Sequence, residues 1–216
     1  MKNLVRKLLR GAGYELLHRA NDPVLTELRM LHDTLRLDSR NRLRWADSLS
    51  QPAAHACYRS LIEMHDIDLV VDVGANQGHF AQLIRRLGYQ GEIVSFEPLR
   101  RYRERLSTLA AADKRWRVLS VALGREAAEL ELRVYQDDSF SSFHAINEVG
   151  KVRFGSLVAP TGVERVPVRK LDDLRKEIGL GSSRRVLLKT DTQGHDLAVL
   201  EGALATLAQT HAVITE

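Results

Sequence analysis

The sequence predicts an α/β fold over residues 67–216, in which a mostly parallel β-sheet is covered by helices on both faces. From residue 68 onward, short and almost continuously apolar runs alternate with longer runs of helical periodicity, a pattern typical of strands buried on both faces. A glycine-containing turn at 72–80 joins the first apolar run to the first helical one. The 216 residues and the hydrophobic content of 44% suit one such domain with a smaller appendage.

The elements of this domain follow from the alternation of the two patterns. Strands are expected at five apolar runs: 69–73, 92–97, 116–122, 185–191 and 211–216. Helices are expected between them, at 79–88, 99–111 and 195–208. Segment 128–136 alternates polar and apolar residues, and together with 163–171 it predicts an added strand pair that flanks a loop. The sequence stops within the last strand, so we expect a sheet whose C-terminal strands are missing.

Residues 1–66 are predicted to form a basic, helical N-terminal extension. Helical spacing of apolar residues appears at 1–20, interrupted by two glycines, and further helices are expected at 23–37 and 52–64. The extension holds 11 Lys and Arg against 8 Asp and Glu, so it carries three of the four net positive charges of the chain. This places the basic character outside the domain with the glycine turn.

The compartment is expected to be the cytoplasm. No stretch approaches the roughly 20 apolar residues of a membrane-spanning helix. The chain starts like a signal peptide, but Arg6, Lys7 and Arg10 break its apolar part and no small-residue cleavage site follows. The basic N-terminal helix leaves two interpretations open: it packs on its own domain, or it contacts the inner membrane face peripherally. The single cysteine, Cys57, excludes an internal disulfide and a cysteine-based zinc site.

The turn reads Asp72-Val-Gly74-Ala-Asn76-Gln-Gly78-His79-Phe80, and its spacing excludes two common ligands. A dinucleotide-binding turn would need glycines where Asn76 and His79 stand, since these let a pyrophosphate approach and a helix pack closely. A phosphate-binding loop would continue with Gly-Lys-Ser or Gly-Lys-Thr, which is absent from the sequence. The turn therefore favours a nucleoside ligand without phosphates, such as S-adenosylmethionine.

Two acids beside the turn agree with that ligand. Asp72 is placed to meet its ammonium group, while amides of the turn and of the following helix start offer donors to its carboxylate or ribose. Glu97 ends the next predicted strand, where an acid can accept hydrogen bonds from both ribose hydroxyls. The turn and Glu97 together are more specific than either alone.

A second polar constellation lies at 187–203. Lys189 and Asp191 are two residues apart, so they are expected on the same side of a strand, near its carboxyl end. Gln193, His195 and Asp196 follow at a helix start. Because ligands bind outside the carboxyl ends of parallel strands, Asp191 is expected near the reactive end of the cofactor. Asp196 is interpreted as an anion that stabilises the helix N-terminus.

Five ordered blocks resemble the FkbM family of S-adenosylmethionine-dependent methyltransferases over residues 68–216: VVDVGANQGHF, VSFEP, VLSVALG, VPVRKLDDL and LLKTDTQGHDLAVLEGA. The resemblance implies a Rossmann-like class I methyltransferase fold that methylates hydroxyl groups, often on sugars, glycolipids or polyketide-type natural products. Its cofactor-binding residues would be Asp72, Gly74, Asn76, Gly78, Phe80, Glu97 and Gln193. Asp191 and Gln193 fall in the active-site block, which usually continues with a glycine, a small or aromatic residue and Glu. Here Gly194-His195-Asp196 stands instead, which leaves a catalytic part for His195 open.

Methyl transfer to a hydroxyl requires in-line alignment and is helped by a general base. Asp191 is the first candidate for that base, followed by His195 and His144. His144 lies in a loop at 137–147 whose length suits a lid over the acceptor, and Phe140 and Phe143 of this loop would contact a sugar face or lipid. No second and third carboxylate stand at a convincing spacing from Asp191, so no metal is predicted.

Two further functions stay open at this point. An RNA methyltransferase agrees with the pI of about 9.4, but acids are interspersed with the basic residues and no aromatic stacking platform is recognisable, so we expect no nucleic-acid partner. A truncated domain that binds cofactor without catalysis agrees with the stop within a strand. The favoured partner is a small-molecule or glycolipid hydroxyl acceptor.

Overall fold

The computed structural model describes residues 42–136, 141–143, 156 and 159–215, with only the backbone of 42–51. Contacts divide the chain into two compact units, Met1–Cys57 and Tyr58–Glu216, and all the strands described below belong to the second unit. The helices expected at 1–20 and 23–37 lie outside the described residues, as do Phe140 and His144.

Helix α3 (Arg42–Met64) is longer than the sequence predicts, since it begins before Pro52 and contains that proline in its interior. The prediction of a start at residue 52 was wrong because proline favours the first turn of a helix without requiring it. The part of α3 that lies in the second unit packs on the core through Leu61 and Ile62. The rings of Tyr58 and Phe80 meet edge to face, with their centroids 5.5 Å apart.

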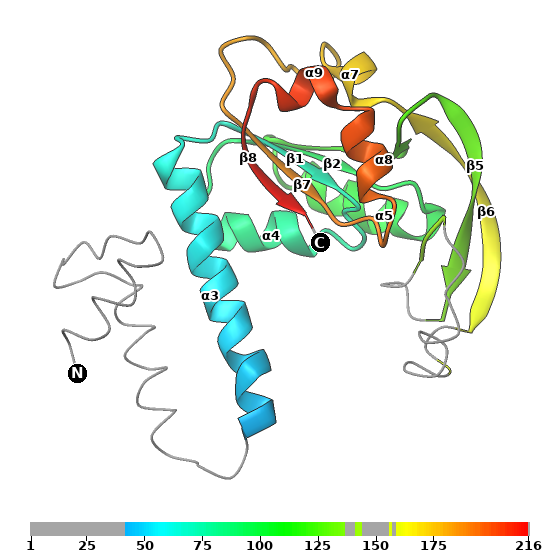
Figure 1. Ribbon diagram of the computed structural model, residues 1–216, viewed down its shortest axis with the longest axis horizontal. Coiled ribbons are helices and arrows are strands. Elements are labelled where there is room, and N and C mark those ends of the chain that lie inside the picture. Colours follow the sequence, from blue (N-terminus) through cyan, green and yellow to red (C-terminus); the bar gives the residue numbers. More distant parts are fainter. Residues whose placement is uncertain (1–41, 137–140, 144–155, 157–158, 216) are drawn as a thin grey trace, which may run out of the picture. The chain divides into compact units, whose positions relative to one another are not determined.

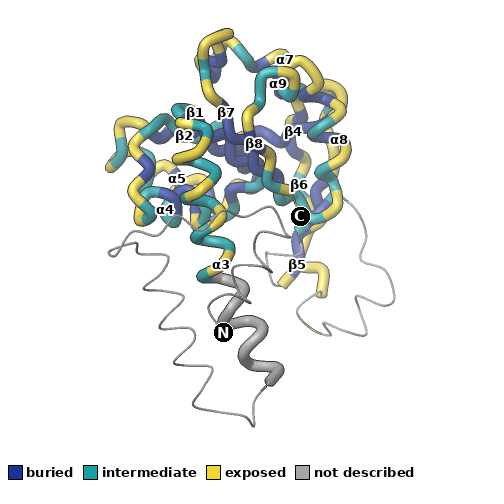
Figure 2. The backbone as a smooth tube through the Cα atoms, turned by 60° about the vertical axis from the view of Figure 1, so that its left-hand side comes forward, coloured by how far each residue is buried: buried dark blue, intermediate teal, exposed yellow. Residues whose placement is uncertain are grey.

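The central sheet has five strands, all paired in parallel, as the sequence predicts. Their order across the sheet is β3 (Trp116–Leu119), β2 (Glu92–Phe96), β1 (Leu69–Val73), β7 (Val186–Thr190) and β8 (Thr210–Thr215) (Figure 1). Every residue of β1 and β7 is buried, whereas the outer strands β3 and β8 carry exposed residues (Figure 2). The near-continuous apolar runs are thus the central strands, which are covered on both faces.

Helices cover both faces of this sheet and form two core clusters with it. On one face, α4 (His79–Arg86) and α5 (Arg100–Ala111) bury Ile84 and Leu106 against strand residues that include Val70. On the other face, α8 (Asp196–Glu201), α9 (Leu204–Leu207) and α7 (Leu171–Leu174) pack on residues that include Val71. The single helix expected at 195–208 divides at Gly202, where a Cβ atom would lie 2.0 Å from the Gly124 carbonyl oxygen. This close backbone approach ends α8.

The added strand pair is confirmed, and it gains a third strand. β5 (Ala128–Tyr135) and β6 (Pro160–Arg169) pair antiparallel, while β4 (Ala122–Leu123) pairs parallel with the other edge of β6. The apolar run predicted as one strand at 116–122 therefore divides between two sheets: β3 ends at Leu119, and Ala122 pairs with Val168 of β6. An apolar run alone does not show at which residue a chain changes partner strands.

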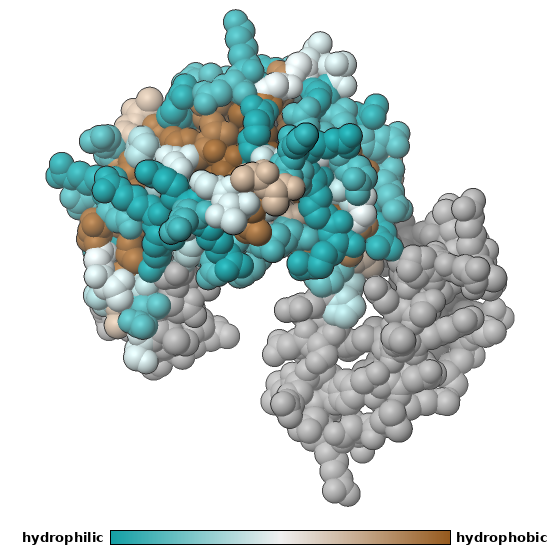
Figure 3. Space-filling view, turned by 180° about the vertical axis from the view of Figure 1, so that it is seen from behind, coloured by the Kyte–Doolittle hydropathy of each residue, from teal (hydrophilic) through white to brown (hydrophobic). Residues whose placement is uncertain are grey.

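The surface of the described residues is largely hydrophilic on the face seen from behind, with a group of hydrophobic residues toward its upper centre (Figure 3). Among the described residues, no helix combines the length and the apolar character that crossing a membrane demands.

Candidate functional site

The candidate site lies at the carboxyl ends of β1, β2 and β7. From β1 the chain proceeds through β2 to β3 on one side, whereas β7 and β8 lie on the other side of β1. The connections after β1 and β7 therefore diverge at this edge, where ligands bind in open parallel sheets. Residues 74–78 follow β1 and residues 191–195 follow β7, so the two polar constellations of the sequence meet here.

The turn after β1 has a conformation that its glycines allow. Gly74, Asn76 and Gly78 all have positive φ, at 77°, 48° and 81°. A Cβ atom on Gly74 would lie 2.0 Å from the carbonyl oxygen of Asp191, and one on Gly78 would lie 2.9 Å from the Trp116 ring. Both glycines thus combine a left-handed backbone with close packing, which no other residue type tolerates well. The turn is held directly against the end of β7.

Glu97 closes the turn from the side of β2. Its Oε2 accepts a hydrogen bond of 2.7 Å from the Asn76 amide, and its Oε1 accepts one of 2.9 Å from the Leu99 amide. The side chain is almost fully buried, and this burial raises the pKa of the carboxyl to about 7, although the two amides act in the opposite direction. Each carboxylate oxygen keeps a second lone pair, so Glu97 has capacity for hydroxyl donors from a ligand.

Asp72 lies inside the sheet and is fully buried. Its register neighbours on β2 and β7 are Ser95 and Lys189. Ser95 Oγ donates to Asp72 Oδ2 at 3.0 Å, and Ser95 Oγ itself accepts from the Trp116 indole N–H at 3.0 Å. Lys189 Nζ is 3.2 Å from Asp72 Oδ1. These contacts give Asp72 a supporting part beneath the turn, while its expected contact with a ligand ammonium stays a prediction.

Lys189 connects the contacts of Asp72, Ser95 and Trp116 to the carboxyl edge of the sheet. Its side chain is only 9% exposed, and Nζ donates to the carbonyl oxygens of Gly74 at 3.0 Å and Val73 at 3.3 Å. Burial alone would lower the pKa of the ammonium, but the nearby carboxylates of Asp72 and Asp191 outweigh burial and raise it. Lys189 is therefore a permanent buried cation directly below the turn. The ring of Phe80 lies beside it, with its centroid 5.7 Å from Nζ.

Asp191 is the half-exposed carboxylate of the site, with 44% of its side chain accessible. Its Oδ2 lies 3.7 Å from Lys189 Nζ, and its Oδ1 accepts a hydrogen bond of 2.9 Å from the Gln193 side-chain amide. The expectation that Lys189 and Asp191 share one side of the strand is thus confirmed. The carboxylate is oriented by two neighbours and still reaches solvent, as a proton acceptor for a bound hydroxyl should be.

The described part of the loop after β5 packs on the segment after β7. Ser142 is buried, and its Oγ donates a 2.7 Å hydrogen bond to the carbonyl oxygen of Gln193. Phe143 lies against His195, with ring centroids 4.6 Å apart. A Cβ atom on Gly124 would lie 3.1 Å from His195 Nε2. His195 is thus enclosed by aromatic and backbone neighbours at the start of α8, and its catalytic part stays a prediction.

Asp196 is the first residue of α8, so it lies at a helix start as the sequence predicts, and its stabilising effect on the helix N-terminus stays a prediction. Its Oδ1 accepts a hydrogen bond of 3.1 Å from the Thr192 amide. In the ranges that the structure describes, no three side chains of the types His, Cys, Asp and Glu come together as a metal site requires. The absence of a metal remains a prediction.

Sequence reasoning did not identify Ser95, Trp116 and Ser142 as parts of the site. Ser95 carried a usable signal, because it stands two residues before Glu97 within an apolar strand and so shares its side of the sheet. Trp116 and Ser142 gave none, since their contacts depend on strand order and on the course of a loop.

Comparison with known proteins decides the family. The model of the methyltransferase FkbM domain matches residues 72–216, from the first residue of the turn to the end of the chain. The chain belongs to the FkbM methyltransferase family. The matched region contains the turn, Glu97 and the 187–203 block, so the site described above lies within the part of the chain that matches the family.

Two relatives agree with this assignment. The 2-O-methyltransferase NoeI of Sinorhizobium fredii (strain NBRC 101917 / NGR234) is 27% identical over 201 residues, which cover 87% of this chain and 80% of that protein. Methyltransferase 1 of Beauveria bassiana (strain ARSEF 2860) is 28% identical over 163 residues, which cover 68% of this chain and 62% of that protein. No solved structure matches the chain. The FkbM membership and these relatives support a methyltransferase.

Proposed function

We propose that this FkbM methyltransferase transfers a methyl group from S-adenosylmethionine to a hydroxyl group, most readily that of a sugar in a glycolipid, a glycan or a natural product. One observation carries the proposal. The turn after β1, closed by Glu97, touches the backbone of Asp191 at Gly74, so a nucleoside site and a half-exposed carboxylate share one edge of the sheet.

The charges of the site suit S-adenosylmethionine. The carboxylates of Asp72 and Asp191 lie 3.2 Å and 3.7 Å from the ammonium of Lys189, and Glu97 adds a third carboxyl group at the turn. A nucleotide phosphate would be repelled by this arrangement, whereas a ligand with a sulfonium cation is attracted. Glu97 would accept hydrogen bonds from the ribose, and the first amides of α4 would meet the carboxylate of the ligand.

The bound cofactor supplies a methyl group that its sulfonium activates toward displacement. The residues of the chain align the acceptor hydroxyl with that methyl group, and alignment of this kind can contribute roughly 7–11 kcal/mol. Asp191 would accept the hydroxyl proton on a carboxylate oxygen as the oxygen–methyl bond forms and the sulfur–methyl bond breaks, with S-adenosylhomocysteine as the leaving group. Gln193 and Lys189 hold the carboxylate for this step.

The acceptor is proposed to approach over the segment after β7, where Ser142 and Phe143 close the site. An aromatic side chain such as Phe143 suits the apolar face of a sugar ring. The printed name of the NoeI relative, a 2-O-methyltransferase, supports oxygen as the methylated atom. Peripheral membrane contact through the predicted basic N-terminal helix belongs to the same proposal, since a glycolipid acceptor would be presented at a membrane surface, and so does a cytoplasmic location.

The proposal is tested by titrating the protein with S-adenosylmethionine in a calorimeter and then assaying transfer of labelled methyl groups to a glycolipid extract. Asp191→Asn is expected to lower the transfer rate by about 10²–10⁴-fold, the usual contribution of a general base, and to leave cofactor affinity nearly unchanged. Asp173→Asn, at an exposed position of α7, is the matched control and should keep the full rate.

Three outcomes separate the competing functions. Cofactor binding without transfer to any acceptor would favour a non-catalytic domain, and absence of cofactor binding would contradict the proposal altogether. Transfer to RNA that falls steeply with salt would favour the RNA methyltransferase.

A further inference from the structure

Lys189 lies between the segment assigned to the cofactor and the segment assigned to the acceptor. Its Nζ is 3.0 Å from the Gly74 carbonyl oxygen of the turn and 3.7 Å from Asp191 Oδ2 after β7. We propose that Lys189 is a positioning residue that ties these two segments together, so that cofactor binding at the turn also fixes the Asp191 carboxylate. This inference rests on the proposed function and deepens it by adding a residue that couples its two halves.

The surroundings of Lys189 fix the place of its ammonium group. Asp72, fully buried, approaches it to 3.2 Å and is itself held by the Ser95 hydroxyl. The Trp116 indole donates to that hydroxyl. Asp72, Ser95 and Trp116 therefore link three neighbouring strands, β1, β2 and β3, beside Lys189. An ammonium group has three donors, and carboxylate and carbonyl oxygens on both segments are available to them here.

Stability alone does not account for this buried ion pair. Replacing a buried pair with apolar residues of similar size is often neutral or stabilising, because both charges must be desolvated. Apolar residues in place of Lys189 and Asp72 would avoid this desolvation cost. Only the lysine also donates to Gly74 on the turn and attracts the carboxylate of Asp191.

The backbone adds a second connection between the same two segments. The Asp191 amide donates to the Val73 carbonyl oxygen at 3.1 Å, and the Gly74 backbone packs against the Asp191 carbonyl. A change in the turn therefore reaches Asp191 both through the backbone and through Lys189. The backbone connection sets the distance between the segments, and the ammonium group orients the Asp191 side chain together with the Gln193 side-chain amide.

Hydrogen–deuterium exchange with and without saturating S-adenosylhomocysteine tests this coupling in the full chain. In the unmodified protein, the ligand should slow amide exchange in two fragments, one containing the turn at 74–80 and one containing 190–196. In Lys189→Met, protection should persist at 74–80 and weaken at 190–196, where only the backbone connection then remains. The affinity for S-adenosylhomocysteine should fall about tenfold, since a hydrogen bond from a charged donor is removed from the turn.

Two further variants keep the test decisive. Asp72→Asn/Lys189→Met removes both buried charges, so it should fold where the single variant leaves Asp72 without a counter-charge, and its protection at 190–196 should weaken in the same way. Arg184→Met is the control, because it removes another partly buried cation just before the same strand, at the opposite edge of the sheet. A merely structural effect would lower the melting temperature in all three variants without changing which fragments the ligand protects.

The outcomes distinguish this inference from the proposed function. Ligand protection at 190–196 that is as strong in the Lys189 variants as in the unmodified protein would overturn the coupling, and the methyltransferase proposal would stand. Absence of S-adenosylhomocysteine binding to the unmodified protein would overturn the proposed function and the coupling with it. Weaker protection at 190–196 in the Lys189 variants than in the unmodified protein, with full protection in Arg184→Met, is the result that we expect.

Discussion

At the scale of single residues, the least ordinary group is the carboxyl of Glu97. Burial raises its pKa to about 7, far above the value in an unfolded chain, while the Asn76 and Leu99 amides favour the ionised form. Because the folded pKa is raised, Glu97 stabilises the cofactor-free fold most below the unfolded pKa, and this contribution is lost as the pH rises through about 7. A ligand that donates hydrogen bonds to Glu97 reverses this preference, since it binds the carboxylate.

Cofactor affinity should therefore depend on pH through Glu97. Binding of S-adenosylmethionine is expected to strengthen as the pH rises from 5.5 and to level off above the Glu97 pKa of about 7. One unit below that pKa, the affinity should be about tenfold weaker, because most of the protein must first release a proton. In calorimetric titrations up to pH 7.5, most of the ligand α-amino group stays protonated, since its pKa is about 7.7–8.0.

Glu97→Gln is the control for this dependence. It should bind the cofactor more weakly at every pH, and its affinity should not change between pH 5.5 and 7.5. An unmodified protein whose affinity is constant over the same range would show that Glu97 does not contact the ligand.

At the scale of elements, the turn between β1 and α4 depends on two separable properties of Gly74. Its φ of +77° is unfavourable for any residue with a Cβ atom, and a Cβ atom would also lie 2.0 Å from the Asp191 carbonyl oxygen. The first property costs roughly 1–2 kcal/mol on its own. The second forces the turn away from the end of β7, where the proposed general base stands.

Gly74→Ala should therefore lose more than stability. We expect unfolding to become easier by well over the roughly 1–2 kcal/mol of the backbone conformation, and cofactor binding to be lost because the turn and Asp191 separate. Gly88→Ala is the matched control, since Gly88 has a φ of +99° and a Cβ atom there would meet nothing within 4 Å. Urea unfolding and cofactor titration of both variants give the comparison. Equal losses in the two variants would mean that the contact with Asp191 is unimportant.

The elements also show how far the sequence could predict this structure. The central strands β1 and β7 were predictable because they are buried on both faces and are therefore mostly apolar. The division of the 116–122 run between two sheets was not predictable. Ala122 pairs with β6, which lies far along the chain, and the run itself contains no sign of this partner. The end of α8 at Gly202 likewise depends on a contact with Gly124, far away in the sequence.

The candidate site also combines features that follow from the local sequence with features that depend on distant parts of the chain. The positions of Lys189 and Asp191 on one side of a strand follow from a two-residue period, and the structure confirms them. The burial of Asp72 between Ser95 and Lys189 depends on the strand order β2-β1-β7, which no local pattern specifies. The sequence therefore predicts which residues lie at the functional edge more readily than it predicts which of them support the others.

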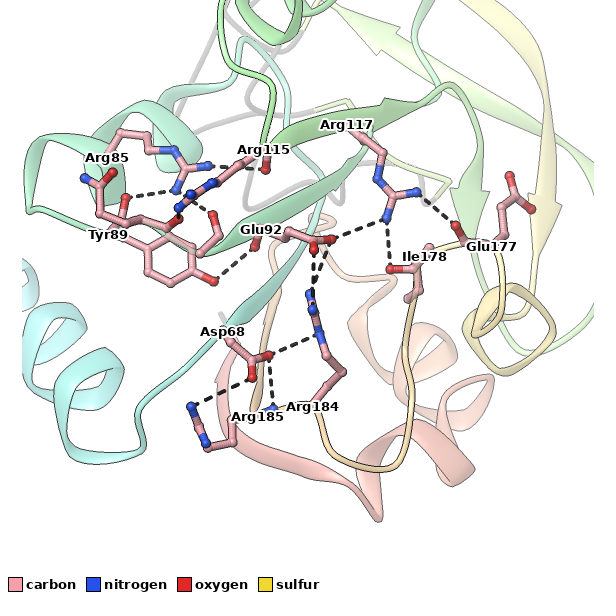
Figure 4. A network of polar contacts seen from close by, with 12 residues as sticks. Asp68, Arg85, Tyr89, Glu92, Arg115, Arg117, Glu177, Ile178, Arg184 and Arg185 are labelled. Carbon is pink, nitrogen blue, oxygen red and sulfur yellow. Dashed lines mark hydrogen bonds and ion pairs between the residues drawn. The ribbon is translucent and has the colours of Figure 1, made fainter.

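At the scale of the whole second unit, the two edges of the central sheet differ in chemistry. The carboxyl edge carries the proposed site. The opposite edge carries a network of arginines, acids and backbone carbonyls (Figure 4). There Arg184 contacts Asp68 at 3.1 Å and Glu92 at 3.3 Å, and Arg117 reaches the carbonyl oxygens of Glu177 and Ile178, each at 2.9 Å. These contacts connect the starts of β1, β2 and β7 to neighbouring segments, so we infer that this edge serves stability.

Arg184→Met tests whether the edge opposite the proposed site serves stability and not ligand binding. Asp68 and Glu92 keep Arg185 at 3.9 Å and Arg117 at 3.8 Å as weaker partners, so the loss should be moderate, about 1–2 kcal/mol in the free energy of unfolding. For a protein of this length, that corresponds to a fall in melting temperature of roughly 2–4 °C per kcal/mol. The loss should shrink at high salt, which screens partly exposed ion pairs.

Calorimetric titration should give an unchanged affinity for S-adenosylmethionine, because the substitution lies at the far edge of the sheet. A variant of normal stability with weakened cofactor binding would contradict the assignment of stability to one edge and ligand binding to the other.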